Sequence, residues 1–147
     1  AVDGVLTDRH RMKGESMTAN EIMELLRTVP DKIFDVDVEL AHVVAHLDEL
    51  KDSLDIAELN AELAVEMPAK TNEDTRKNLR AEAVSKSPDV KQIKAMIRDE
   101  YIRQSGIENE RSKNTRTFSA ALAMAELAAA QLNAVAARTR KEIVTHE

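Results

Sequence analysis

The chain has 147 residues, no cysteine, a formal net charge of −6 and an aromatic content of 2%. The length suits one domain, the lack of cysteine excludes disulfide bonds and thiolate chemistry within this sequence, and the scarcity of aromatic residues argues against a compact globular enzyme. Because 33% of the residues are charged and the apolar residues recur at helical spacing, the composition predicts an elongated all-α protein.

The first 16 residues carry scattered charges without helical periodicity, and we expect them to form an N-terminal arm. Thr18 and Glu21 follow the capping-box pattern, in which each residue's side chain accepts a hydrogen bond from the other's backbone amide. This pattern predicts a short helix over residues 19–29. Pro30 should end that helix, because proline lacks an amide hydrogen.

The next helix is expected over residues 33–67 and is strongly acidic. Its apolar residues are spaced alternately by four and three, at Val36, Leu40, Val43, Leu47, Leu50, Leu54, Ala57, Ala61 and Ala64. This heptad spacing is typical of a coiled coil, in which one apolar stripe faces a partner helix. Since one helix cannot bury its own stripe, other parts of the chain must cover it.

Two further helices are predicted after Pro68. Thr71 should cap a mostly polar helix over residues 73–85. The sequence Ser87-Pro88-Asp89 then combines a capping residue, a first-turn proline and an acid at the positive end of the helix dipole. It predicts the start of a last helix over residues 88–144.

The last helix has two apolar stretches separated by a polar one. The first contains Val90, Ile93, Ile97 and Tyr101, and the second contains Phe118, Leu122, Ala125, Ala129, Leu132, Ala136 and Ile143. Between them, Glu108, Arg111 and Thr115 occupy positions where the apolar stripe should continue, and Gly106 weakens the helix. Either this helix bends near Gly106 and folds back, or its halves pack on different partners. The alanine-rich residues 119–137 would allow close helix approach at a subunit interface.

Charge is divided unevenly along the chain. Residues 31–67 contain eleven acids and two bases, net −9, whereas residues 70–117 contain twelve bases and eight acids, net +4. One interpretation is that the acidic helix packs beside the basic segment, with charges paired across the rim. The other is that the basic segment faces an anionic ligand.

The sequence offers little support for catalysis or metal binding. His42 and His46 have the four-residue spacing of a two-histidine metal site, but no third histidine or cysteine is near in sequence, so we expect a solvated pair. We find no nucleophile elbow, phosphate-binding glycine loop or paired Glu-x-x-His pattern. The protein is therefore expected to be no enzyme and to need no metal or cofactor.

The polar block in the last helix is the candidate ligand-binding site. Arginine binds phosphate or carboxylate through two parallel hydrogen bonds, and asparagine can bind a base or ribose edge. Alternatively, one buried polar layer can specify how helices pair. The candidate residues are Tyr101, Asn109, Arg111, Lys113, Asn114 and Arg116.

Residues 70–132 resemble a group of small helical accessory proteins of bacteriophages and prophages. The resemblance depends on Lys70-Thr71-Asn72-Glu73-Asp74-Thr75-Arg76 opening a helix, then on a Ser-Pro break, and then on a long helix with Glu108, Arg111 and Phe118. It implies a non-enzymatic protein that acts by binding. The implied setting is phage recombination or the countering of host defence.

The leading hypothesis is an oligomeric helical binding protein of phage type that inhibits or sequesters a host component, either a defence protein or a small nucleotide signal. The alternatives are a phage structural or scaffold component and an accessory protein of nucleic-acid recombination. Nucleic acid is the less favoured partner, because the chain is acidic and poor in aromatic residues. No uninterrupted apolar run approaches 18 residues and the N-terminal residues are polar, so we expect no membrane span and a cytoplasmic location.

Overall fold

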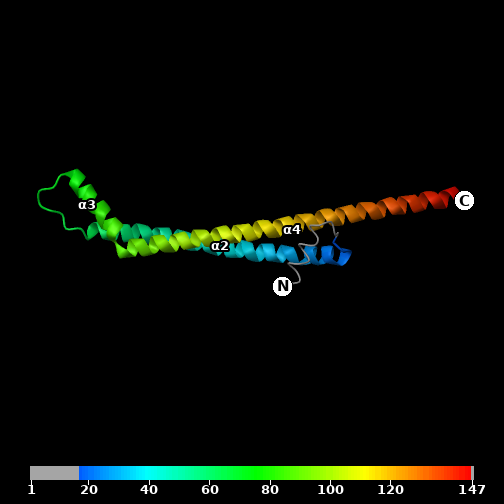
Figure 1. The fold of residues 1–147 in the computed structure, drawn as a ribbon, viewed down its shortest axis with the longest axis horizontal. Helices are drawn as coiled ribbons and strands as arrows, with labels where there is room; N and C mark the ends of the chain where they lie inside the picture. Colours follow the sequence, from blue (N-terminus) through cyan, green and yellow to red (C-terminus); the bar gives the residue numbers. More distant parts are fainter. Residues whose placement is uncertain (1–16, 147) are drawn as a thin grey trace. The chain divides into compact units, whose positions relative to one another are not determined.

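The computed structural model describes residues 17–146, in which it has three helices and no strand (Figure 1). Helix α2 spans Ala19–Leu63, α3 spans Glu73–Lys86 and α4 spans Pro88–His146. Helix accounts for 91% of the described residues, which confirms the all-α prediction. The expected arm, residues 1–16, lies outside the described residues.

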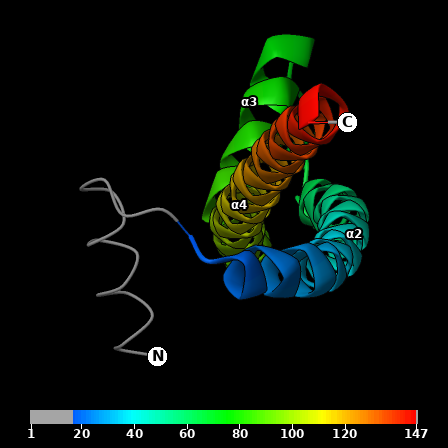
Figure 2. The same ribbon diagram turned by 90° about the vertical axis from the view of Figure 1, so that its right-hand side faces the viewer.

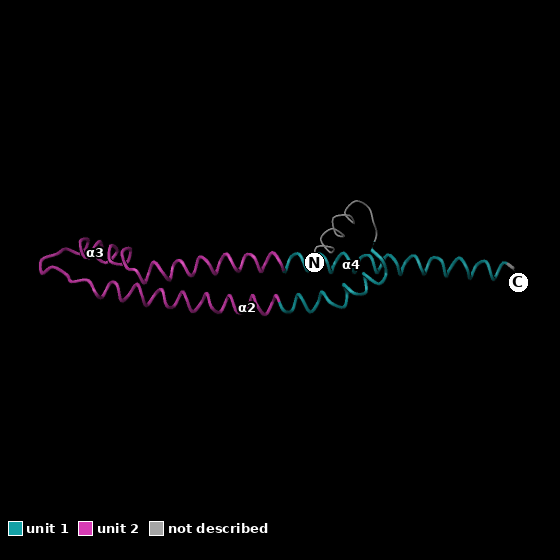
Figure 3. The backbone as a smooth tube through the Cα atoms, turned by 60° about the horizontal axis from the view of Figure 1, so that its bottom comes forward, with its two compact units in different colours: residues 1–35, 111–147 teal, residues 36–110 magenta. Residues whose placement is uncertain are grey.

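The chain groups into two compact units, shown in different colours in Figure 3. Unit 2 comprises residues 36–110, and unit 1 comprises the described residues 17–35 and 111–146. Helices α2 and α4 are each divided between the two units, with one segment in each unit. The two units are described separately below.

In unit 2, α2 and α4 run antiparallel and side by side (Figure 1). Their core contains Val36, Val43 and Leu47 from α2 and Ile107 from α4, with Leu40 and Ile97 packed against it. The stripe predicted for the acidic helix is therefore the packed face of α2. Burial of such side chains stabilises by about 1.5–3 kcal/mol each. Burial along this face decreases toward its C-terminal end, where Ala57 and Ala61 are half-buried and Ala64 is exposed.

In unit 1, the first part of α2 lies beside the beginning of the α4 segment that follows residue 110 (Figure 2). Ile22 and Val29 of α2 and Ala121 of α4 are buried there. Ala121 is fully covered, whereas Leu122, which we expected on the packed stripe, is 43% exposed. The packed face of α4 in this unit continues through Asn114 and Phe118, which are half-buried.

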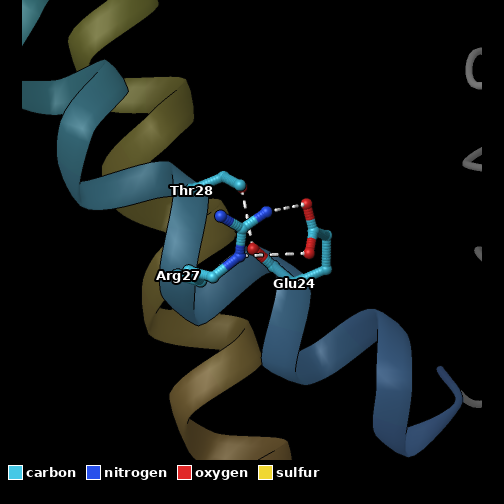
Figure 4. A network of polar contacts seen from close by, with 3 residues as sticks. All are labelled: Glu24, Arg27 and Thr28. Atoms are coloured by element: carbon cyan, nitrogen blue, oxygen red, sulfur yellow. Dashed lines mark hydrogen bonds and ion pairs between the residues drawn. The ribbon is translucent and has the colours of Figure 1, made fainter.

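The predicted break at Pro30 is wrong, because α2 continues through this residue. The heptad spacing persists across it: Leu26, Val29 and Ile33 are all buried or half-buried, while Pro30 is exposed. Continued burial offsets the hydrogen bond that proline cannot donate. Just before Pro30, the Arg27 guanidinium donates two hydrogen bonds to the Glu24 carboxylate, at 3.3 and 2.7 Å, and the Thr28 hydroxyl donates one to the Glu24 carbonyl, at 2.8 Å (Figure 4).

The capping residue was predicted for three helix starts, and two of the three agree with the structure. The amides of Thr18 and Glu21 donate to each other's side chains at 2.9 and 3.3 Å, which confirms the capping box. The Val90 amide donates to the Ser87 hydroxyl at 3.4 Å, which confirms the cap of α4, and α3 begins at Glu73 as expected. The cap of α3 is Asn72, however, whose side chain accepts from the Thr75 amide at 2.8 Å.

The predicted end of the acidic helix was four residues too late, since α2 ends at Leu63. The Val65 amide donates to the Glu62 carbonyl at 3.3 Å, a three-residue bond that tightens the last turn. The stripe has ended there, so packing no longer supports another helical turn.

Gly106 does not interrupt α4, which is one unbroken helix from Pro88 to His146. The alternative in which the helix bends there and folds back is therefore wrong. A Cβ atom built on Gly106 would meet nothing within 4 Å. Glycine at this position is not required by any close contact.

Candidate functional site

The six residues of the predicted ligand site all lie on α4. Tyr101 and Asn109 belong to unit 2, and Arg111, Lys113, Asn114 and Arg116 belong to unit 1. Asn114 is half-buried and the other five are exposed. Their role in binding an anionic ligand stays a prediction.

Tyr101 has a partner within unit 2. The Lys51 ammonium lies 5.5 Å from the centre of the Tyr101 ring, a cation–π distance. A hydrogen bond to the Tyr101 side chain raises the pKa of Lys51. Tyr101 therefore links α4 to α2 at the rim instead of continuing the packed stripe.

The polar positions expected on the packed stripe are on the solvent side. Glu108, Arg111 and Thr115 are exposed, whereas Ile107 is buried and Asn114 is half-buried. The reason is a one-residue shift of register. In unit 2 the packed face of α4 is made by residues spaced alternately by three and four, namely Val90, Ile93, Ile97, Glu100, Gln104 and Ile107.

This register places a carboxylate on the packed face of unit 2. The side chain of Glu100 is 15% exposed. Its Oε2 lies 3.3 Å from His46 Nδ1, and its Oε1 lies 3.7 Å from an Arg103 guanidinium nitrogen. Arg103 also lies 3.5 Å from Glu39 Oε1 of α2. We call these four residues the Glu100 cluster.

The Glu100 cluster is incompletely satisfied. Glu100 Oε2 is buried and accepts no well-oriented hydrogen bond, although His46 is within ion-pair distance. Burying such a carboxylate costs free energy unless cationic or hydrogen-bonding groups face it. This cost restricts which residues can lie opposite Glu100. Sequence reasoning missed Glu100, but continuing the spacing of Ile93 and Ile97 would have found it. The pair of Glu39 and Arg103 confirms one of the charge contacts expected across the rim.

His42 and His46 do not define a metal site. Both are exposed, and His46 faces Glu100. Among the side chains of residues 17–145, no three His, Asp or Glu groups are placed to hold one ion.

A shallow groove of about 420 Å³ lies in unit 2, where the end of α2 meets the start of α4. On α2 the groove is lined by Ser53, Ile56, Ala57 and Ala61. On the other side it is lined by Asp89 and Gln92 of α4 and by Ser87, which caps that helix. Alanine at the packed positions leaves this space unfilled. In the sequence, this groove is indicated by the change from leucine to alanine at the packed positions of α2 after Leu54.

The last part of α4 exposes several large apolar side chains. Every residue from 126 to 145 is exposed, and we call this range the exposed segment of α4. Its large apolar residues are 58–72% exposed: Leu127, Leu132, Val135, Ile143 and Val144. Contiguous exposed apolar patches often mark interaction surfaces.

By length and composition alone, α4 could also cross a membrane. It contains an 18-residue window with a mean hydropathy of 1.4, of which 6% is buried. Our expectation of no such segment required an uninterrupted apolar run, and the alanine-rich part of α4 is interrupted by Glu126 and Gln131. The absence of a membrane span and the cytoplasmic location both stay predictions.

Comparison with protein-family models, with curated proteins and with solved structures finds no match to this chain.

Proposed function

We propose that the protein is a non-enzymatic helical binding protein that works as a homo-oligomer. One observation carries this proposal: the exposed segment of α4 presents leucine, valine and isoleucine side chains that no other helix covers within the described part of the chain. Burial of this surface against a second copy would remove apolar area from water. An assembly built through residues 119–137 would use alanine to bring helices close together.

We further propose that α2 and α4 form an antiparallel coiled-coil hairpin within an elongated helical bundle. The heptad spacing of the packed positions on both helices supports this architecture. The Glu100 cluster would then specify the register, because shifting the helices would leave a buried carboxylate without cations.

As a binding protein, the assembly is proposed to inhibit or sequester a host component in the manner of the phage accessory proteins that residues 70–132 resemble. The exposed side chains of Arg111, Lys113 and Arg116 suit an anionic ligand such as a small nucleotide. Calorimetry of the wild-type protein against a panel of nucleotides tests this version. Heat of binding that is lost in Arg116→Ala would support it, and silence across the panel with the assembly intact would exclude it.

A structural or scaffold component is the second candidate, and the same exposed segment favours it. Recovery of the protein in purified particles would support this role over inhibition.

Self-association is tested by one substitution in the alanine-rich range. Ala129 is exposed in the single chain, so Ala129→Glu should leave the chain folded but place an unpaired charge in the proposed interface. We expect sedimentation velocity to show a shift to a smaller species. Ala125→Glu should have the same effect but is less specific, because Ala125 is half-buried within unit 1.

Ala123→Glu is the matched control. Ala123 is also exposed, and it lies on the opposite side of the helix from the packed face. If Ala129→Glu and Ala123→Glu reduced the assembled mass equally, the added charge itself would be responsible and not its position on the helix.

A further inference from the structure

The packed face of α4 in unit 1 continues past the part of the helix that α2 covers. Ala121 on this face is fully covered. Burial then decreases along the helix, since Ala125 is half-buried and every residue from 126 to 145 is exposed. Apolar and small residues spaced by four and three nevertheless continue as far as Ile143. A surface that is already an interface within the chain therefore extends into the exposed segment of α4.

These continued positions form one side of the helix, which we call the α4 stripe: Ala125, Ala129, Leu132, Ala136, Thr139 and Ile143. At about 100° per residue, the six positions lie within an arc of about 80°. None of them is charged, and the side chains of Leu132 and Ile143 are 71% and 58% exposed. The stripe is therefore an apolar face that a partner helix could cover.

Polar residues line one edge of the α4 stripe in an ordered way. Glu126, Asn133 and Arg140 are seven residues apart, so they lie on the same side of the helix, and all three are exposed. This edge has an acid at its start, an amide in the middle and a base at its end. The pattern complements itself when one copy is reversed in direction relative to the other.

The direction of pairing decides whether these charges meet. In an antiparallel pair of heptad helices the same edge of each helix faces its counterpart, whereas in a parallel pair each edge faces the opposite edge. A parallel pair would bring Arg140 beside Val135 and Glu126 beside Ala121, so neither charge would meet an opposite one. The edge therefore favours an antiparallel partner.

We propose that the α4 stripe binds the α4 stripe of a second copy, with the helices antiparallel and Asn133 of each copy beside Asn133 of the other. Glu126 of each copy then lies beside Arg140 of its partner, which gives two pairs of opposite charge. A shift of seven residues in either direction would separate these pairs. This inference rests on the self-association proposed above, and it names the surface that the segment binds and the direction of binding.

The same alignment sets small residues opposite large ones along the stripe. Leu132 lies opposite Ala136 of the second copy, and Ile143 lies opposite Ala125. Facing positions that alternate between large and small side chains interdigitate without leaving space. Packing and charge therefore select the same alignment.

Charge reversal tests the proposed edge contact. Glu126→Arg and Arg140→Glu each replace both pairs by contacts between like charges, and we expect each variant to raise the dissociation constant about tenfold at low salt, measured by sedimentation. An equimolar mixture of the two variants should recover wild-type affinity, because both contacts in the mixed pair are again of opposite charge.

Lys141→Glu is the matched control for Arg140→Glu. It makes the same change of charge at the next residue, which is exposed and lies on the side of the helix away from the α4 stripe. We expect it to leave the dissociation constant nearly unchanged. An equal effect of Lys141→Glu, or no recovery in the mixture, would overturn the pairing.

Disulfide trapping tests the direction, since the chain has no cysteine of its own. Affinity-tagged Ala129→Cys protein is mixed with untagged Thr139→Cys protein and oxidised. Antiparallel pairing places these two positions opposite each other, so we expect a linked pair that contains both proteins. Parallel pairing would separate them by about 15 Å along the helices, which no disulfide spans. Links that join each variant only to itself would overturn the proposed direction.

The self-association proposal and the antiparallel pairing fail in different ways. A monomeric wild-type protein would contradict self-association itself. An assembled wild type without the link between Ala129→Cys and Thr139→Cys would overturn only the pairing of the two stripes. Flotation of the wild type with phosphatidylcholine vesicles, with loss of the link, would also overturn the pairing, because lipid would then cover the stripe.

Discussion

Glu100 is the one acidic side chain that lies on the packed face of α4 in unit 2, and its neighbours lie at 3.3 Å or more. Replacing a buried ion pair by an apolar residue is often neutral or stabilising by about 1–4 kcal/mol. We therefore expect Glu100→Leu to keep or raise the free energy of unfolding in urea. His46 is left with its ring partly solvated and Arg103 keeps Glu39, so no charge becomes buried and unpaired.

The neighbouring solvent-side acid supplies the control for that substitution. Glu108 is exposed, so Glu108→Leu should leave the free energy of unfolding nearly unchanged. A clear loss of stability in Glu100→Leu alone would show that the carboxylate stabilises the fold and does more than specify its register.

Gly106 offers a substitution without a steric cost. Nothing lies within 4 Å of the position that a Cβ atom would take, and alanine in a helix interior is favoured over glycine by about 1 kcal/mol. Gly106→Ala should raise the unfolding midpoint in urea monitored by circular dichroism. Lower stability in the variant would indicate that the helix needs glycine at this position.

At the scale of elements, Pro30 weakens α2 without ending it. The residue is exposed, and its missing amide hydrogen leaves the Leu26 carbonyl without its usual helical donor. Pro30→Ala restores that donor, and a proline in a helix interior costs about 3 kcal/mol relative to alanine. We expect higher thermal stability and slower amide hydrogen exchange near residue 30. Faster exchange there would contradict a continuous helix.

Helix α3 has no buried residue, so side-chain pairs matter more to its stability. A hydrogen bond from Lys86 lowers the pKa of Glu82 below its usual value of 4.5. Because the pKa is lower in the folded state, the pair contributes stability that is present above about pH 4.5 and is lost as pH falls through the lowered pKa.

An NMR titration of the Glu82 carboxyl group in the wild type and in Lys86→Ala checks the origin of this shift. The pKa of Glu82 should rise toward its usual value in the variant. An unchanged pKa would mean that another group holds it down.

The helix starts that depend only on neighbouring residues could be predicted from the sequence. The Thr18–Glu21 capping box and the Ser87-Pro88 restart require only neighbouring residues, and both were predicted correctly. Pro30 was misread because its effect depends on burial of Val29 and Ile33 against another segment, which no local rule contains. The register of α4 was misread because Tyr101 is apolar enough to pass for a packed residue.

At the scale of the whole molecule, the sequence indicated two long apolar stripes but not how much of each the chain itself covers. The packed face of α2 is covered in both units, as Val29 and Val43 show, whereas Leu132 and Val135 are exposed. The sequence could not show whether the predicted ligand residues form a site. A shift of one residue in the packed face of α4 decides whether Arg111 faces another helix or solvent. The proposed self-association would cover the exposed part of α4.

Light scattering on the wild-type protein at micromolar concentration tests this central claim most directly. We predict a mass of at least twice the 16.4 kDa of one chain. A mass near 16.4 kDa across the micromolar range would contradict it, because the exposed segment of α4 would then remain uncovered in solution.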